Sequence, residues 1–154
     1  MKYKKIILSL LIIIWMGAIF TFSSQVSDKS SNTSGNTIRF VLNKLQITKN
    51  MNKQQENELV ERLQGPVRKM AHFSVYALGG IISYMLFSQY EISNKKRIAY
   101  SLLLCMIYAI TDECHQYFVP GRSCELRDIL IDSSGALLGI FITYVIKNKT
   151  MNNI

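Results

Sequence analysis

Acidic and histidine side chains stand at the ends of apolar segments in this 154-residue chain. Asp112, Glu113 and His115 end one apolar segment, and Asp128 and Asp132 begin the next. A charged residue deep in a bilayer costs about 2.5–3.5 kcal/mol on insertion scales, so membrane carboxylates usually have a function. Carboxylates and histidines are also the side chains that most often transfer protons in catalysis.

The strongest candidates for proton transfer are Asp112, Glu113 and His72. Asp112 and Glu113 can act as general acid or base, and His72 can shuttle a proton. The alternative is that these groups only form an ion-pair network that locks helices together, as many buried pairs do. The number of acids, bases and histidines expected at one depth of the membrane exceeds what helix packing requires. This excess favours a functional site.

Other polar groups recur at helical spacing beside these three. Arg68, His72 and Tyr76 follow one another at i, i+4 and i+8, and Asp128, Asp132, Gly135 and Gly139 lie on one face of a later segment. Two glycines four residues apart allow another helix to approach closely. We therefore predict a polar pocket between three helices, whose binding residues are Arg68, Lys69, Tyr76, Gln116, Arg122, Asp128 and Asp132. Arg68, Lys69, Arg122 and Arg127 would neutralise the acids.

The elements that position these residues are four apolar segments. Hydrophobic residues make up 49% of the chain and are grouped in blocks, without the regular polar positions of a soluble amphipathic helix. A membrane-spanning helix needs about 20 residues. We predict spans at about residues 6–25, 69–89, 98–118 and 127–146 within a single domain of residues 1–154. The predicted fold is all-α, an integral membrane four-helix bundle.

Basic residues at the ends of these segments predict the orientation. Lys2, Lys4 and Lys5 precede the first segment, Lys95 to Arg97 separate the second and third, and Lys147 and Lys149 follow the fourth. With four spans all of these charges fall on one side, which the positive-inside rule makes cytoplasmic. Both termini are then cytoplasmic. The net charge of +8 is mostly an orientation signal, and we expect no nucleic-acid binding.

The segment between the first two spans, residues 26–67, is predicted to form an outer loop. Residues 27–37 are rich in Ser, Asn and Gly, which indicates flexibility. Apolar residues at helical spacing in 37–45 and 52–63 predict two short helices on the membrane surface or over the bundle.

A metal site and a disulfide are weaker interpretations of the same residues. His72, His115, Asp112 and Glu113 are metal-ligand types, but no HExxH-type spacing is present, and we expect neither a metal nor another cofactor. Cys114 and Cys124 flank the turn at Pro120 and could meet, although a single pair is weak evidence for a disulfide.

The motifs resemble those of the VanZ-like family. They are Phe22-Ser23-Ser24-Gln25, Lys69-x-x-His72-Phe73-x-x-Tyr76, Asp112-Glu113-x-x-Gln116-x-Phe118-Val119-Pro120-Gly121-Arg122, and Asp128-x-x-x-Asp132-x-x-Gly135-x-x-x-Gly139. The resemblance adds Ser23 and Gln25 to the binding candidates. It implies a multi-pass protein of the cell membrane, in a Gram-positive bacterium, that raises resistance to the lipoglycopeptide teicoplanin. The chain departs from the family pattern at Asp132, where many members look to carry Asn. Cys114 and His115 fall at positions that the family pattern leaves open.

Three functions remain open. The first is an enzyme acting on a membrane lipid or a lipid-linked cell-wall precursor at the outer face, with Arg122 and Lys69 holding a phosphate or carboxylate. The second is a protein without catalytic activity that binds or masks such a lipid, or the lipoglycopeptide itself. The third is a proton-coupled transporter, for which membrane carboxylates are also typical, although the inner halves of the spans offer few ionisable groups.

Overall fold

The computed structural model describes residues 2–25 and 27–152, which form five helices and no strand. They are α1 (Lys2–Ser23), α2 (Ser27–Lys44), α3 (Lys53–Phe87), α4 (Asn94–Tyr117) and α5 (Leu126–Asn152). The all-α prediction is confirmed. The predicted loop start at residue 26 and the chain ends at 1, 153 and 154 lie outside the described residues.

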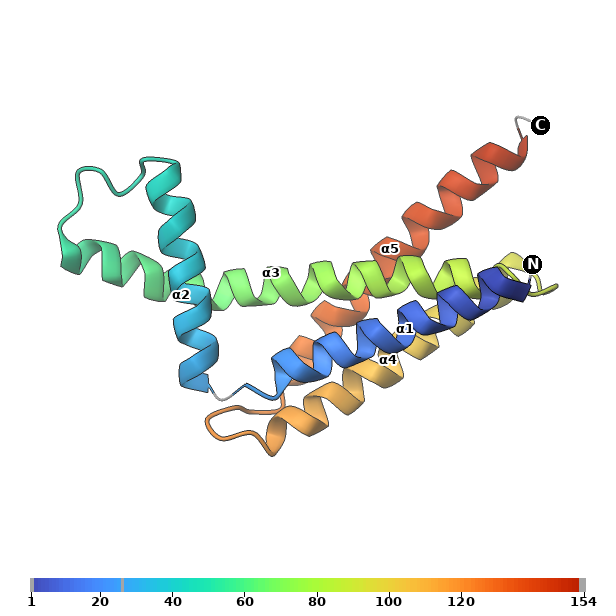
Figure 1. Ribbon diagram of the computed structural model, residues 1–154, viewed down its shortest axis with the longest axis horizontal. Helices are drawn as coiled ribbons and strands as arrows, with labels where there is room; N and C mark the ends of the chain where they lie inside the picture. The colour runs from blue at the N-terminus through green and yellow to red at the C-terminus, as the bar shows by residue number, and fades with distance from the viewer. Residues whose placement is uncertain (1, 26, 153–154) are drawn as a thin grey trace.

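Helix α3 is the central element of the fold. It contacts each of the other four helices, most extensively α5 (Figure 1). A capping box at Asn52 and Gln55 starts it, and it continues through Pro66 without a break. The expected second surface helix and the second span are therefore one continuous helix.

Glycines allow α3 and α5 to pack backbone to backbone. A Cβ atom on Gly135 would meet the carbonyl oxygen of Phe73, and one on Gly139 would meet that of Ala77. Gly80 of α3 faces the backbone of Ala136 in the same way. The close approach predicted from Gly135 and Gly139 is therefore present, and its partner is α3.

Helix α1 packs on α3 and α4 through Trp15. The indole Nε1 donates a hydrogen bond to the carbonyl oxygen of Val75 at 2.9 Å, and the ring packs edge-on against Tyr76. Gly79 leaves room for the same ring. Apolar side chains on the opposite side of α1, such as Ile13 and Ile14, are exposed, as expected of a helix that faces lipid.

Three of the described helices are long and apolar enough to cross a membrane: Tyr3–Ser23, Lys53–Phe87 and Leu126–Thr150. This supports the prediction of a membrane protein. Helix α4 is not among them, because Asp112, Glu113 and His115 in its last turns lower its hydropathy. The fourth span, and with it the four-helix bundle, stays a prediction.

The basic ends of the helices lie together. In Figure 1 the start of α1, the turn before α4 and the end of α5 lie at one end of the molecule, and α2 lies at the other. Lys5 Nζ of α1 lies 4.3 Å from the centre of the Tyr90 ring, which belongs to the turn before α4. This placement agrees with the charge distribution from which cytoplasmic termini are predicted.

The expectation of a flexible segment over residues 27–37 is wrong, because α2 is helical from Ser27. Ile38 and Leu42 of α2 pack against Val60 of α3, and Gly35 lies against Val60 and Gln64. Packing on α3 compensates for the weak helix propensity of the Ser- and Asn-rich half. The prediction that this loop is helical is confirmed.

Candidate functional site

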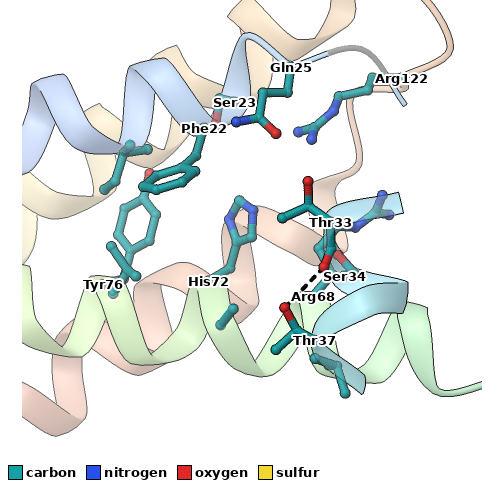
Figure 2. Close-up of a pocket in the computed structure, with 14 residues that line it drawn as sticks. Phe22, Ser23, Gln25, Thr33, Ser34, Thr37, Arg68, His72, Tyr76 and Arg122 are labelled. Carbon is teal, nitrogen blue, oxygen red and sulfur yellow. Dashed lines mark hydrogen bonds between the residues drawn. The ribbon is translucent and has the colours of Figure 1, made fainter. Parts of the chain in front are cut away.

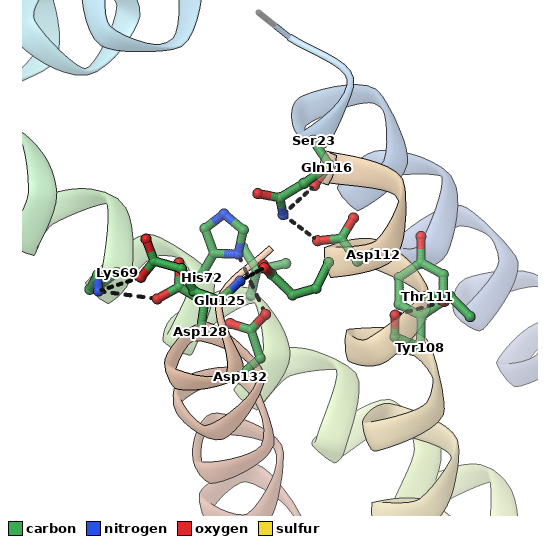
Figure 3. Close-up of polar contacts among 12 residues, drawn as sticks. Ser23, Lys69, His72, Tyr108, Thr111, Asp112, Gln116, Glu125, Asp128 and Asp132 are labelled. Atoms are coloured by element: carbon green, nitrogen blue, oxygen red, sulfur yellow. Dashed lines mark hydrogen bonds and ion pairs between the residues drawn. The ribbon is translucent and has the colours of Figure 1, made fainter. Parts of the chain in front are cut away.

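Most of the ionisable residues that the sequence singled out meet at the end of the molecule where α1 and α4 finish and α5 begins (Figure 3). We call Asp112, Glu113, Asp128, Asp132 and His72 the acidic cluster. Asp112, Glu113 and Asp132 are 3%, 1% and 0% exposed, although they are carboxylates. Such burial is rare unless a charge or a hydrogen bond compensates for it.

His72 and Asp132 face each other across the α3–α5 interface. His72 Nδ1 lies 3.6 Å from Asp132 Oδ2. The close packing at Gly135, one turn after Asp132, places the two helices near enough for this contact. His72 of α3 therefore pairs with Asp132 of α5.

Gln116 connects three elements. Its Nε2 donates to Asp112 Oδ2 at 2.9 Å and to Ser23 Oγ at 3.4 Å, and its Oε1 accepts a hydrogen bond from Arg122 Nη1 at 3.1 Å. A β-turn positions Arg122: its backbone N–H donates to the carbonyl of Val119, and Gly121 takes the φ of 77° that the turn requires. The sequence placed Gln116 on this face but did not show that it joins α1, α4 and the turn.

Lys69 and Glu113 hold α5 in place. Lys69 Nζ lies 3.1 Å from Asp128 Oδ1 and 3.9 Å from Glu125 Oε2, which ties α3 to the start of α5. Glu113 Oε2 accepts a hydrogen bond from the backbone N–H of Glu125 at 3.0 Å. Both side chains thus contact the segment that leads into α5.

A cavity of about 340 Å³ opens beside the acidic cluster, between α1, α2 and α3 (Figure 2). Its walls are mostly apolar, formed by side chains such as Ile19, Val67 and Val75. The polar and aromatic side chains that line it are Phe22, Ser23, Gln25, Thr33, Ser34, Thr37, Arg68, His72, Tyr76 and Arg122. His72 belongs to both the cavity and the acidic cluster and connects the two.

Two guanidinium groups reach the cavity. Arg68 comes from α3 and Arg122 from the turn before α5. Burial, and after it the nearby charge of Arg68, lowers the pKa of Arg122 from its ordinary value, while Asp112 and Glu113 act in the opposite direction. An arginine remains charged at physiological pH even so. The cavity therefore has a cationic side that would attract an anion.

Several predicted residues contribute to the cavity, and others do not. Ser23, Gln25, Arg68, His72, Tyr76 and Arg122 line it. Lys69, Asp112, Glu113, Gln116, Asp128 and Asp132 lie outside this lining, in the acidic cluster and its hydrogen-bonded surroundings. Arg127, a predicted neutralising charge, is exposed. The α2 side chains in the lining were missed, because the Ser- and Asn-rich sequence indicated a flexible loop.

The remaining histidine and the outer cysteines take no part in the acidic cluster. His115 stacks on Phe20 with ring centres 4.5 Å apart, and its Nε2 lies 3.0 Å from Ser24 Oγ. Cys114 and Cys124 are free thiols and both are exposed. The disulfide that the sequence left open is therefore not formed.

The comparison with protein families finds one match over most of the chain. The family model described as VanZ/LLP1 matches residues 8–147. Neither the curated proteins nor the solved structures contain a match. The matched range includes every residue of the acidic cluster and of the cavity lining.

Proposed function

Since the chain belongs to the VanZ/LLP1 family, we propose that it is a cell-membrane protein that binds an anionic lipid, or a lipid-linked cell-wall precursor, in the cavity and acts on its head group. The observation that carries this proposal is the composition of the cavity wall. Arg68 and Arg122 lie on one side, and apolar side chains cover most of the remainder. A ligand that matches both parts has a negative head and an apolar tail.

The binding energy would come from both parts of such a ligand. Hydrogen bonds to charged groups contribute about 1.5–3 kcal/mol each, and the planar guanidinium fits phosphate and carboxylate oxygens with two parallel bonds. The tail would lie along Ile19, Val67 and Val75 of α1 and α3. The sequence suggested Lys69 for the anion, but the structure favours Arg68, because Lys69 is paired with Asp128.

His72 is the residue best placed for chemistry on a bound head group. It lines the cavity, and the buried Asp132 lies against its Nδ1. A carboxylate behind a histidine orients the ring and stabilises its protonated form, which is how general bases are supported in many enzymes. Asp112 and Glu113 remain candidates for a second proton transfer.

At the level of the cell, the VanZ resemblance supports a role in reduced sensitivity to teicoplanin in a Gram-positive host. The affected molecule would be an anionic envelope lipid or wall precursor, so the antibiotic would encounter an altered surface. The second candidate is a protein without catalysis that holds the lipid, or the lipoglycopeptide tail, in the same cavity. The apolar walls favour this reading, since they fit a tail without any reaction.

The binding step is tested with the purified full chain in nanodiscs or detergent. We expect phosphatidylglycerol to bind more tightly than phosphatidylcholine, and Arg68→Gln and Arg122→Gln to weaken the preference about 10-fold each, the equivalent of one lost hydrogen bond to a charged group. Arg62→Gln, an exposed arginine of the same helix that lies outside the cavity, is the matched control. Equal binding of the two lipids by the wild type would contradict the proposal.

The catalytic step is tested by teicoplanin susceptibility at matched expression, measured by membrane immunoblot. A general acid or base typically contributes 10²–10⁴-fold in rate, so resistance should collapse in His72→Gln or in at least one of Asp112→Asn and Glu113→Gln. A binding protein should tolerate all three changes and lose resistance in Arg68→Gln. Full resistance in the three acid–base variants would therefore favour binding without catalysis.

A further inference from the structure

Three metal-ligand side chains from three different helices converge beside the cavity. His72 of α3, Asp112 of α4 and Asp132 of α5 each offer one ligand atom, and these atoms lie within 4.8 Å of one another. Figure 3 shows His72 joined to Asp132 by a dashed line, with Asp112 nearby on α4. A His with two carboxylates is a ligand set that binds first-row divalent ions.

The distance between His72 and Asp132 is compatible with a shared ion. Nδ1 and Oδ2 are 3.6 Å apart, and hydrogen bonds between nitrogen and oxygen are about 2.7–3.2 Å long. Two ligands of a tetrahedral zinc ion, each bound at about 2.0–2.1 Å, lie about 3.3–3.4 Å apart. The observed separation is therefore close to that of two ligands on one metal.

The oxygens at this position have few donors. Asp132 Oδ1 and Asp112 Oδ1 have no hydrogen-bond partner among the described residues, and Asp132 Oδ2 has only His72 Nδ1, at the ion-pair distance of 3.6 Å. Both side chains are more than nine-tenths buried. The Tyr76 hydroxyl is also buried and has no hydrogen-bond partner among the described residues. Buried polar groups in proteins are nearly always satisfied, so this position calls for a ligand.

Two basic side chains near this position have partners of their own. Lys69 pairs with Asp128 and Glu125. Arg122 hydrogen-bonds to Gln116, whose amide lies between it and Asp112. Asp112 and Asp132 thus place two carboxylates beside one histidine, and a divalent cation bound there would balance their charges.

We propose that His72, Asp112 and Asp132 bind a divalent transition-metal ion, with Zn²⁺ as the best match. Three protein ligands with a fourth position left open is the arrangement of catalytic zinc sites. His72 also lines the cavity, so an oxygen of an anionic head group bound there could complete the coordination. This departs from the expectation of no metal, which rested on sequence spacing alone. Its use rests on the proposed function, in which the bound ion would replace His72 as the group that acts on the head group. Metal binding itself can be measured without any lipid or reaction.

The test measures zinc content in purified full-length protein. The starting protein carries Cys114→Ser and Cys124→Ser, because both thiols are exposed and free and would bind zinc themselves. After removal of metal with a chelator and dialysis against Zn²⁺, we expect one ion per chain by elemental analysis. Asp132→Asn and His72→Gln should weaken zinc affinity by at least about 10-fold, the smallest effect usual for residues around a metal.

The matched control is His115→Gln, which changes the only other histidine of the chain and lies outside the cluster. It should bind zinc like the starting protein. Substoichiometric zinc in the starting protein would overturn the proposal, as would an equal loss in His115→Gln and His72→Gln. Zinc binding without any effect on lipid or resistance would support the metal site and count against the proposed function alone.

A second measurement keeps the test independent of variants that fold poorly. The same protein, with no change in the cluster, is titrated with Co²⁺, whose visible spectrum reports its ligands. We expect d–d bands of a four- or five-coordinate ion with nitrogen and oxygen ligands and competition by Zn²⁺. A spectrum of fully hydrated Co²⁺ at saturation would exclude the site.

Discussion

Gln116 offers the sharpest test of how the site is held together. Its amide joins Asp112, Ser23 and Arg122, which belong to α4, α1 and the turn before α5. Replacing it with Met keeps the length of the side chain and removes both polar atoms. Asp112, only 3% exposed, would then lose the hydrogen bond from Gln116, and Arg122 would lose its acceptor there.

The two short hydrogen bonds determine the expected magnitude. A hydrogen bond to a charged group contributes about 1.5–3 kcal/mol in soluble proteins, and interhelical polar contacts in membranes contribute about 0.6 and at most about 1.7 kcal/mol. The ranges overlap near 1.5 kcal/mol per bond. The third contact, to Ser23 at 3.4 Å, is too long to add much. We expect Gln116→Met to lower the free energy of unfolding by about 3 kcal/mol.

The assay can use the single tryptophan of the chain. Trp15 lies at the α1–α3 contact, hydrogen-bonded to Val75 and packed on Tyr76, so its fluorescence reports unfolding in detergent micelles. Gln54→Met, at an exposed position of α3, is the control and should change stability by less than about 0.5 kcal/mol.

A double-mutant cycle shows whether the lost partner of Asp112 is the cause. If it is, adding Asp112→Asn should recover part of the loss, with a coupling energy of about 0.5–3 kcal/mol. Additive losses in the double variant, or a loss below about 0.5 kcal/mol for Gln116→Met alone, would refute the reasoning.

Two further predictions concern packing and orientation. Gly139→Ala should lower the folded yield and destabilise the chain by about 1–3 kcal/mol, because its Cβ would meet the carbonyl oxygen of Ala77. Gly17→Ala, at a position with open space, should do neither, and equal stability of the two variants would show that α3 and α5 do not pack through glycine. In a background without exposed thiols, Asn57→Cys should react with an impermeant thiol reagent on intact cells, and Lys95→Cys should not. The basic ends of the helices predict a cytoplasmic position for Lys95. Labelling of Lys95→Cys from outside would show that the predicted orientation is wrong.

Much of the helical architecture of this protein can be predicted from the sequence alone. The apolar residues are grouped in long segments, which predicts membrane helices, because segments outside a membrane rarely carry some 20 apolar residues in a row. The basic residues predict which ends of the helices lie on the same side. The glycines at 135 and 139 predict where another helix comes close. The polar residues at helical spacing predict that one end of the molecule is rich in ionisable groups.

The tertiary structure decided which of these groups meet. Periodicity places a residue on a face of its helix but does not give the rotation and height of that helix against its neighbours. His72 could have paired with Asp112 or Glu113 on spacing alone, and the glycine contact between α3 and α5 puts it opposite Asp132.

The same limit applies to Lys69 and Arg68, which are adjacent in sequence. Adjacent residues on a helix point about 100° apart, so Lys69 reaches Asp128 while Arg68 reaches the cavity. The first part of helix α2, residues 27–36, was missed for a different reason. Its Ser- and Asn-rich sequence has weak intrinsic helix propensity, and the helix is supported by contacts with α3 at Gly35, Ile38 and Leu42.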